Sequence, residues 1–200
     1  HITSNDGLHS TFIHPSPSSL LPIDTIYHSF TNSSCGYTAY NGSMNSFDMQ
    51  ITASNYCGFS FSDIAPIVLS SEPEASMYFN QDTVGCNGQT LYTFVDSSDN
   101  GYVTSYNVSS QQYECDSINA INWEINPSTG YTLVSGNLGN NPPSYGWPST
   151  YGTDSISVVF DEPGSYSITL YSYNQCGGSA TQDSILQNIC IDSSAHSSFV

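Results

Sequence analysis

The sequence contains no lysine and no arginine among its 200 residues. All of its charge comes from 17 aspartates and glutamates, so the formal net charge is −17 at pH 7. Binding to nucleic acid or to anionic lipid through charge requires basic side chains, so both modes of binding are excluded. The same absence excludes a Schiff-base lysine and a cationic clamp for phosphoryl or carboxylate substrates.

Long hydrophobic runs are also missing. The longest apolar stretch, 64–69, is interrupted by Pro66 and is too short to cross a bilayer. No signal peptide is visible, and the chain opens on His1. We therefore expect a processed chain or a fragment without membrane insertion. A disordered chain is excluded as well, because 38% of the residues are hydrophobic and include 15 Tyr, 9 Phe and 2 Trp.

Groupings of catalytic residues are sparse. The sequence has neither a Gly-x-Ser-x-Gly nucleophile elbow nor a phosphate-binding loop. The carboxylate pairs Glu72/Glu74 and Asp161/Glu162 lie in an expected linker and an expected turn, where solvated loop residues are the simpler interpretation. The sequence therefore predicts a protein that is not an enzyme. Its histidines, all outside the best-formed part of the chain, are at positions 1, 9, 14, 28 and 196.

Apolar and polar residues alternate along several short segments, which is the pattern of half-buried strands. The clearest example is 166–172, in which Tyr166, Ile168 and Leu170 share one side. Dipeptides typical of turns, such as Asn100-Gly101 and Pro163-Gly164, separate the segments. The spacing predicts an all-β protein built as an antiparallel sandwich. The other expected strands are 47–53, 91–95, 121–125, 155–160 and 185–191.

An internal repeat indicates more than one module. Residues 47–58 (FDMQITASNYCG) and 166–177 (YSITLYSYNQCG) place an aromatic residue, apolar residues, Asn, Cys and Gly in the same register. The polar stretch 70–74 (SSEPE) suits a short linker. We therefore expect the chain to divide near residue 72.

Residues 160–166 (FDEPGSY), continuing to 174–177 (NQCG), resemble the closing half of a polycystin-type (PKD) domain, an immunoglobulin-like β-sandwich. Trp123 resembles the core tryptophan of that family, and residues 79–94 resemble the opening strands of variants from large secreted proteins of Bacteroidota-type bacteria. The Gly-Asp-Gly that often follows the family's tryptophan is replaced by 126–130 (NPSTG), so no binding role of that loop is implied.

The resemblance implies tandem immunoglobulin-like (PKD-type) β-sandwich modules with antiparallel strands. The expected domains are a partial or strand-complemented module over 1–72, a PKD-type module over 73–192 and a C-terminal tail over 193–200.

The six cysteines indicate an oxidising compartment, and their even number favours disulfides. Many pairings are open to six cysteines, and buried reduced thiols are an alternative. No two cysteines are close enough in sequence for the usual zinc spacing. Proximity favours the pairs Cys35–Cys57, Cys86–Cys115 and Cys176–Cys190.

A triplet of Asp, then Ser or Thr, then an aliphatic residue occurs five times, more often than chance gives for this composition. It resembles the O-glycosylation sequon of the same bacterial phylum. The alternative interpretation is structural, because Asp and Ser favour turns and an aliphatic residue can begin the next strand. The acceptors would be Thr25, Thr83, Ser117, Ser155 and Ser184, and Asn-x-Ser sequons at Asn32, Asn41 and Asn107 are weaker signals in a chain rich in Ser and Asn.

Two further segments are candidate binding sites. Residues 96–101 (DSSDNG) offer oxygen ligands for calcium through Asp96, Asp99 and Asn100, although Asn-Gly is itself a hairpin signal. No other cofactor is expected. A loop rich in Pro and Gly carries three rings that could stack on a sugar, anchor in a neighbouring subunit or pack on their own module. These rings are Tyr145, Trp147 and Tyr151.

Together these features predict a secreted, extracellular or cell-surface protein, a structural or adhesive building block of a fibre or repeat array. The alternative is a carbohydrate-binding module of a secreted hydrolase. The expected partners are copies of the chain itself, and glycans are a second candidate. A partial first module would expose strand edges, so 2–13 or 185–191 is expected to pair with a sheet of another subunit.

Overall fold

The computed structural model describes residues 1–13, 25–84, 89–117, 120–140, 148, 150–174 and 181–192, and gives only the backbone of residues 83, 84 and 89. These residues form antiparallel strands and no helix, as the alternation predicts, and none of them forms a helix that could cross a membrane. The strands are β1 (Ile2–Ser4), β2 (His9–Ser10), β3 (Phe47–Asn55), β4 (Gly58–Ile67), β5 (Met77–Val84), β6 (Gln89–Asp96), β7 (Val103–Asn107), β8 (Gln112–Asp116), β9 (Ala120–Asn126), β10 (Tyr131–Ser135), β11 (Ser155–Phe160), β12 (Gly164–Asn174) and β13 (Thr181–Ile191).

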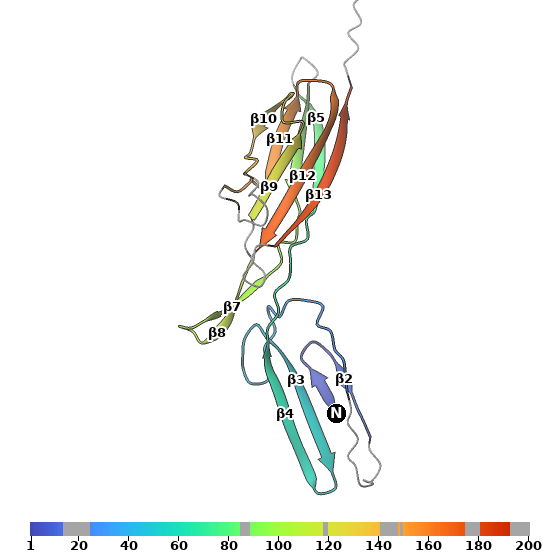
Figure 1. Ribbon diagram of the computed structural model, residues 1–200, viewed down its shortest axis with the longest axis vertical. Helices are drawn as coiled ribbons and strands as arrows, with labels where there is room; N and C mark the ends of the chain where they lie inside the picture. The colour runs from blue at the N-terminus through green and yellow to red at the C-terminus, as the bar shows by residue number, and fades with distance from the viewer. Residues whose placement is uncertain are drawn as a thin grey trace, which may run out of the picture. The chain divides into compact units, whose positions relative to one another are not determined.

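The chain divides into two compact units (Figure 1). Unit 1 comprises His1–Ser71 together with Tyr102–Asp116, and unit 2 comprises Glu72–Gly101 together with Ser117–Val200. The first division falls within the polar stretch 70–74. The units differ from the expected bounds of 1–72 and 73–192 at the hairpin of β7 and β8. This hairpin follows β6 in sequence but belongs to unit 1, and we call it the exchanged hairpin.

Unit 2 is formed by two antiparallel sheets with strand orders β10-β11-β6-β5 and β13-β12-β9. This is the strand order of the seven-stranded immunoglobulin constant-type sandwich. The core lies between the sheets, and Tyr166, Ile168 and Leu170 are buried in it as their alternation predicts. The neighbouring strand β9 of the same sheet adds Ile121, Trp123 and Ile125. The opposing sheet contributes Phe94 from β6 and Ile156 and Val158 from β11.

The Tyr166 side chain closes one end of this core. Its hydroxyl donates to the Gly130 carbonyl oxygen at 2.9 Å and to the Glu162 carbonyl oxygen at 3.0 Å. Gly130 has a φ of +82°, and a Cβ there would collide with the Tyr166 hydroxyl. A tyrosine hydroxyl that returns to the backbone a few residues upstream is also a feature of immunoglobulin-like sandwiches.

We expect Tyr166→Phe to lower the melting temperature of unit 2 by a few degrees, because two carbonyl oxygens lose a common donor. Tyr171→Phe is the matched control, since its hydroxyl donates to the exposed Glu124 carboxylate, and it should change the melting temperature less. Thermal unfolding followed by the fluorescence of the core Trp123 measures both. An equal loss in the two variants would contradict this role of Tyr166.

The described residues of unit 1 form a four-stranded sheet with the order β2-β1-β3-β4 and the two-stranded β7–β8 hairpin. Phe47 is buried at the base of β3, where the rings of Phe30 and Tyr37 lie 4.5 and 4.6 Å from it. The N-terminal strand β1 pairs with β3 of its own chain, and β13 pairs with β12 of its own chain. The segment 2–4 is therefore not a free donor strand, and β13 is an edge strand that is already paired with β12 on one side.

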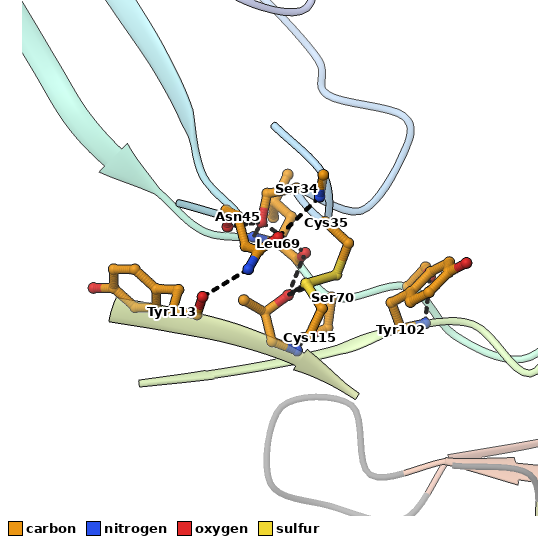
Figure 2. The surroundings of a disulfide bond; sticks show 11 residues. Ser34, Cys35, Asn45, Leu69, Ser70, Tyr102, Tyr113 and Cys115 are labelled. Carbon is orange, nitrogen blue, oxygen red and sulfur yellow. Dashed lines mark hydrogen bonds between the residues drawn. A yellow bond between two sulfur atoms is a disulfide. The ribbon is translucent and has the colours of Figure 1, made fainter. Parts of the chain in front are cut away.

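A disulfide joins Cys35 to Cys115 in β8, across 80 residues of sequence (Figure 2). The expected pairs Cys35–Cys57 and Cys86–Cys115 are therefore wrong, because proximity in sequence did not anticipate the exchanged hairpin. Cys57 and Cys190 carry free, exposed thiols, which also overturns Cys176–Cys190. Cys86 and Cys176 lie outside the described residues.

Hydrogen bonds surround this disulfide and fix the hairpin within unit 1 (Figure 2). Asn45 Nδ2 donates to the Tyr113 carbonyl oxygen at 2.7 Å, and Thr104 N donates to Ser70 Oγ at 2.9 Å. Ser34 N donates to the Leu69 carbonyl oxygen at 2.9 Å. Hydrogen bonds and the disulfide therefore stabilise the position of this hairpin in unit 1, whereas unit 2 is stabilised by a hydrophobic core.

Replacing both Cys35 and Cys115 by Ser should lower the stability of unit 1 by about 4.5 kcal/mol, the chain-entropy value for a loop of this length. Hydrogen exchange should become faster in residues 34–46 and 103–116 and stay unchanged in 166–174.

The double variant Cys57→Ser, Cys190→Ser is the control, because it removes two thiols that form no disulfide in the structure. Faster exchange in this control, or none in the first variant, would show that the Cys35–Cys115 bond does not hold the hairpin.

Candidate interaction surface

A polar cluster near the N-terminus combines Ser4, Asp6 and His28. The Ser4 hydroxyl donates to Asp6 Oδ1, and His28 Nε2 lies 2.7 Å from Asp6 Oδ2. The carboxylate stands between the hydroxyl and the imidazole, so the arrangement lacks the serine–histidine contact of a nucleophile with its base. Desolvation alone would raise the pKa of Asp6, but the hydrogen bonds from Ser4 and His28 and the charge of His28 outweigh it and lower that pKa.

Two further carboxylates, Asp48 and Asp63, lie on β3 and β4. Asp48 accepts hydrogen bonds from the backbone N–H groups of Asn5, at 3.2 Å, and Tyr40. Asp63 Oδ1 is buried and has no hydrogen-bond partner among the described residues. Desolvation and the nearby charge of Asp48 raise the pKa of Asp63. The ionised form of Asp63 therefore opposes folding, whereas the ionised form of Asp6 favours it.

The expected calcium ligands accept hydrogen bonds from other groups of the protein. Asp96 Oδ1 accepts the Ser98 N–H and Asp99 Oδ1 accepts the Gly101 N–H, each at 2.9 Å. Asn100 Oδ1 accepts the Ser172 hydroxyl at 3.1 Å. Across the described ranges, no three His, Cys, Asp or Glu side chains gather in a group that could hold a metal ion. The geometry is that of a capped turn.

Most expected glycosylation acceptors lie at exposed positions. Asn107 is an exception, because its side chain is half-buried and donates to Glu114 Oε1 at 2.8 Å. The structural interpretation of the triplet holds at 154–156, where Ile156 is fully buried in β11. The side chain of Thr83 lies outside the described residues. The exposed acceptors are Thr25, Ser117, Ser155, Ser184, Asn32 and Asn41.

The expected aromatic loop is described only in part. Tyr151 is exposed, while Tyr145 and Trp147 lie outside the described residues. The structure therefore does not test whether these three rings lie together.

The most open apolar surface lies on the hairpin of β3 and β4, which sequence analysis did not single out. Phe59 is 77% exposed, Phe61 is 56% exposed and Tyr56 at the turn is fully exposed. The tip forms an open hollow of about 350 Å³ lined by 53–55 and 57–60. The signal was present in 58–62 (GFSFS), whose alternation puts both phenylalanines on one face.

The repeat explains the exposure of the face that carries Ile51, whereas Phe59 and Phe61 lie on the opposite face of the hairpin, beside Ser54 and Thr52. Ile51 occupies in 47–58 the position that Leu170 occupies in 166–177. Leu170 is fully buried beneath the second sheet of unit 2, whereas Ile51 is 37% exposed. Within the described part of unit 1, a single four-stranded sheet stands where unit 2 has two sheets. The β3–β4 hairpin is therefore the candidate interaction surface.

No family model, curated protein or solved structure matches this chain. Its role is therefore argued from its own residues and from the motifs in its sequence.

The two carboxylates with opposite shifts should respond oppositely to substitution. Asp6→Asn should destabilise the protein near neutral pH, because the ionised Asp6 is favoured by folding, and the difference should close as the pH falls below the usual value of 3.8. Asp63→Asn should stabilise it near neutral pH, because folding disfavours the ionised Asp63, and this gain should also fade in acid. Urea unfolding at a series of pH values measures both, and the same sign for the two variants would contradict the assignment.

Proposed function

We propose that this protein is an extracellular structural or adhesive building block, a non-catalytic component of a cell-surface fibre or repeat array. The observation that carries the proposal is the strand order of unit 2, β10-β11-β6-β5 over β13-β12-β9, with Trp123 in its core. Immunoglobulin-like sandwiches of this order are frequent in cell-surface proteins. The polycystin-type pattern at 160–166 and 174–177 supports the same class.

The disulfide supports a location outside the reducing cytosol. A bond across 80 residues that closes unit 1 is typical of proteins that fold in an oxidising compartment. Because the sequence contains no lysine and no arginine, trypsin has no cleavage site anywhere in the chain. Both features suit a protein exposed to extracellular proteases.

Labelling intact producer cells with an antibody raised against this chain tests the proposal. We expect the label on the outer surface, in fibres or patches, and resistant to removal by trypsin. Label that appears only after the cells are permeabilised would overturn the extracellular role.

A carbohydrate-binding module is the alternative, with the exposed Tyr151 as one of its rings. A glycan array on the whole chain separates the two functions. The building block should bind no glycan at micromolar concentration, and saturable binding that Tyr151→Ala abolishes would favour the alternative.

A further inference from the structure

The β3–β4 hairpin combines two features that invite another strand. The outer edge of β4 pairs with no other strand in the part of the chain that the structure describes. Phe59 and Phe61 lie on one face of that strand, beside Ser54 and Thr52 of β3, and both rings are mostly exposed. Free main-chain groups and two aromatic rings therefore meet along one edge.

The sequence of this edge is nearly symmetric about Ser60. Residues 58–62 read Gly, Phe, Ser, Phe, Ser, so small residues flank two phenylalanines on either side of the centre. An antiparallel pairing of two such strands about Ser60 places Phe59 of each copy opposite Phe61 of the other. Directly opposed aromatic pairs stabilise antiparallel strands, and here they occur twice. A strand that complements itself is the basis of a two-fold contact.

Charge restricts where two copies can meet. Each copy carries a formal charge of −17 with no basic residue to offset it, so contact between acidic faces is repulsive. The hairpin tip, residues 51–62, carries no charge at all. Asp63 and Pro66 lie beyond the symmetric segment, and the lysines that commonly protect strand edges are absent from the chain. The tip is therefore a place at which two copies can approach without charge repulsion.

The other long edge strand, β13, offers less. Its side chains Ile185 and Ile189 pack against the core of unit 2. On its outer face Leu186, which is 56% exposed, stands between Ser184 and Asn188. This edge has no second large apolar side chain on that face with which a copy could pair.

We propose that β4 pairs antiparallel with β4 of a second copy of this chain, centred on Ser60, so that the two sheets of unit 1 become one continuous sheet. The contact rests on the proposed role as a building block, which supplies copies at high local concentration. Covering the four phenylalanines and the strand edges buries on the order of 1,000 Å² in total, the size of a weak, reversible interface. Repetition in an array strengthens such contacts through effective concentration.

Sedimentation velocity of the whole chain, from low micromolar to millimolar concentration, tests this contact. The wild type should shift reversibly from monomer to dimer. Phe61→Lys should weaken the dimer at least about tenfold, because it puts a charge on the edge and removes an aromatic pair. Leu186→Lys is the matched control, since Leu186 is also 56% exposed on an edge strand, and it should leave the dimer unchanged.

Cysteine trapping tests the register without relying on the lysine variant. In a Cys57→Ser, Cys190→Ser background, Ser60→Cys should form a disulfide-linked dimer on mild oxidation, because each Ser60 faces its own copy across the two-fold axis. Ser62→Cys, which faces Gly58 of the other copy, should not, and the background alone should form no disulfide-linked dimer.

A wild type that is monomeric at every concentration overturns the inference, as does a dimer that is weakened by Leu186→Lys and not by Phe61→Lys. Efficient trapping through Ser62→Cys rather than Ser60→Cys overturns the proposed register. These results are independent of the cell-labelling experiment. A monomer found on the cell surface removes the contact and keeps the proposed function, and a dimer found only inside cells does the reverse.

Discussion

The carboxylates of this protein must be held without lysine or arginine, and much of the structure follows from that constraint. Where a chain with lysine or arginine would form ion pairs, this one uses neutral donors. Asp183 accepts the Ala75 N–H, and Asp48 accepts two backbone N–H groups. Asp96 and Asp99 each accept an N–H within their own turn. Hydrogen bonds to ionised acceptors are stronger than neutral ones, so each carboxylate fixes a local backbone conformation as an ion pair would not.

The two units are stabilised by different physics as a result. Unit 2 follows the usual route, in which two sheets bury an aromatic and aliphatic core around Trp123. Unit 1 has a small core at Phe47 and depends on side chain–backbone hydrogen bonds and on the Cys35–Cys115 bond. Because a single sheet cannot bury both faces, its hairpin keeps phenylalanines in solvent. Unit 2 thus buries its core between two sheets, whereas the β3–β4 hairpin of unit 1 leaves large apolar side chains exposed.

Local patterns in the sequence did not single out β4, β7, β8 or β10. They predicted β3, β6, β9, β11, β12 and β13, because alternation and turn residues act over a few neighbours. The segment 166–172 shows this, since its inward and outward residues are those expected. Contacts between distant segments could not be predicted in this way. Proximity paired Cys35 with Cys57, whereas an exchanged hairpin brings Cys115 to it. Alternation also predicted the strand at 47–53 but not its exposure, because exposure depends on whether a second sheet covers that face. The interaction surface was missed because β4, which carries Phe59 and Phe61, was not among the expected strands.

The exchanged hairpin also constrains the order in which the two units can be completed during synthesis. The chain passes between the units three times, after Ser71, after Gly101 and after Asp116. A ribosome delivers residues from the N-terminus onward, so unit 1 lacks its covalent closure until Cys115 has emerged, by which time β5 and β6 of unit 2 are already outside. Each unit consists of two separate segments of the chain, so cutting the chain at the linker leaves unit 1 without its hairpin. The two units therefore have to be synthesised as one chain.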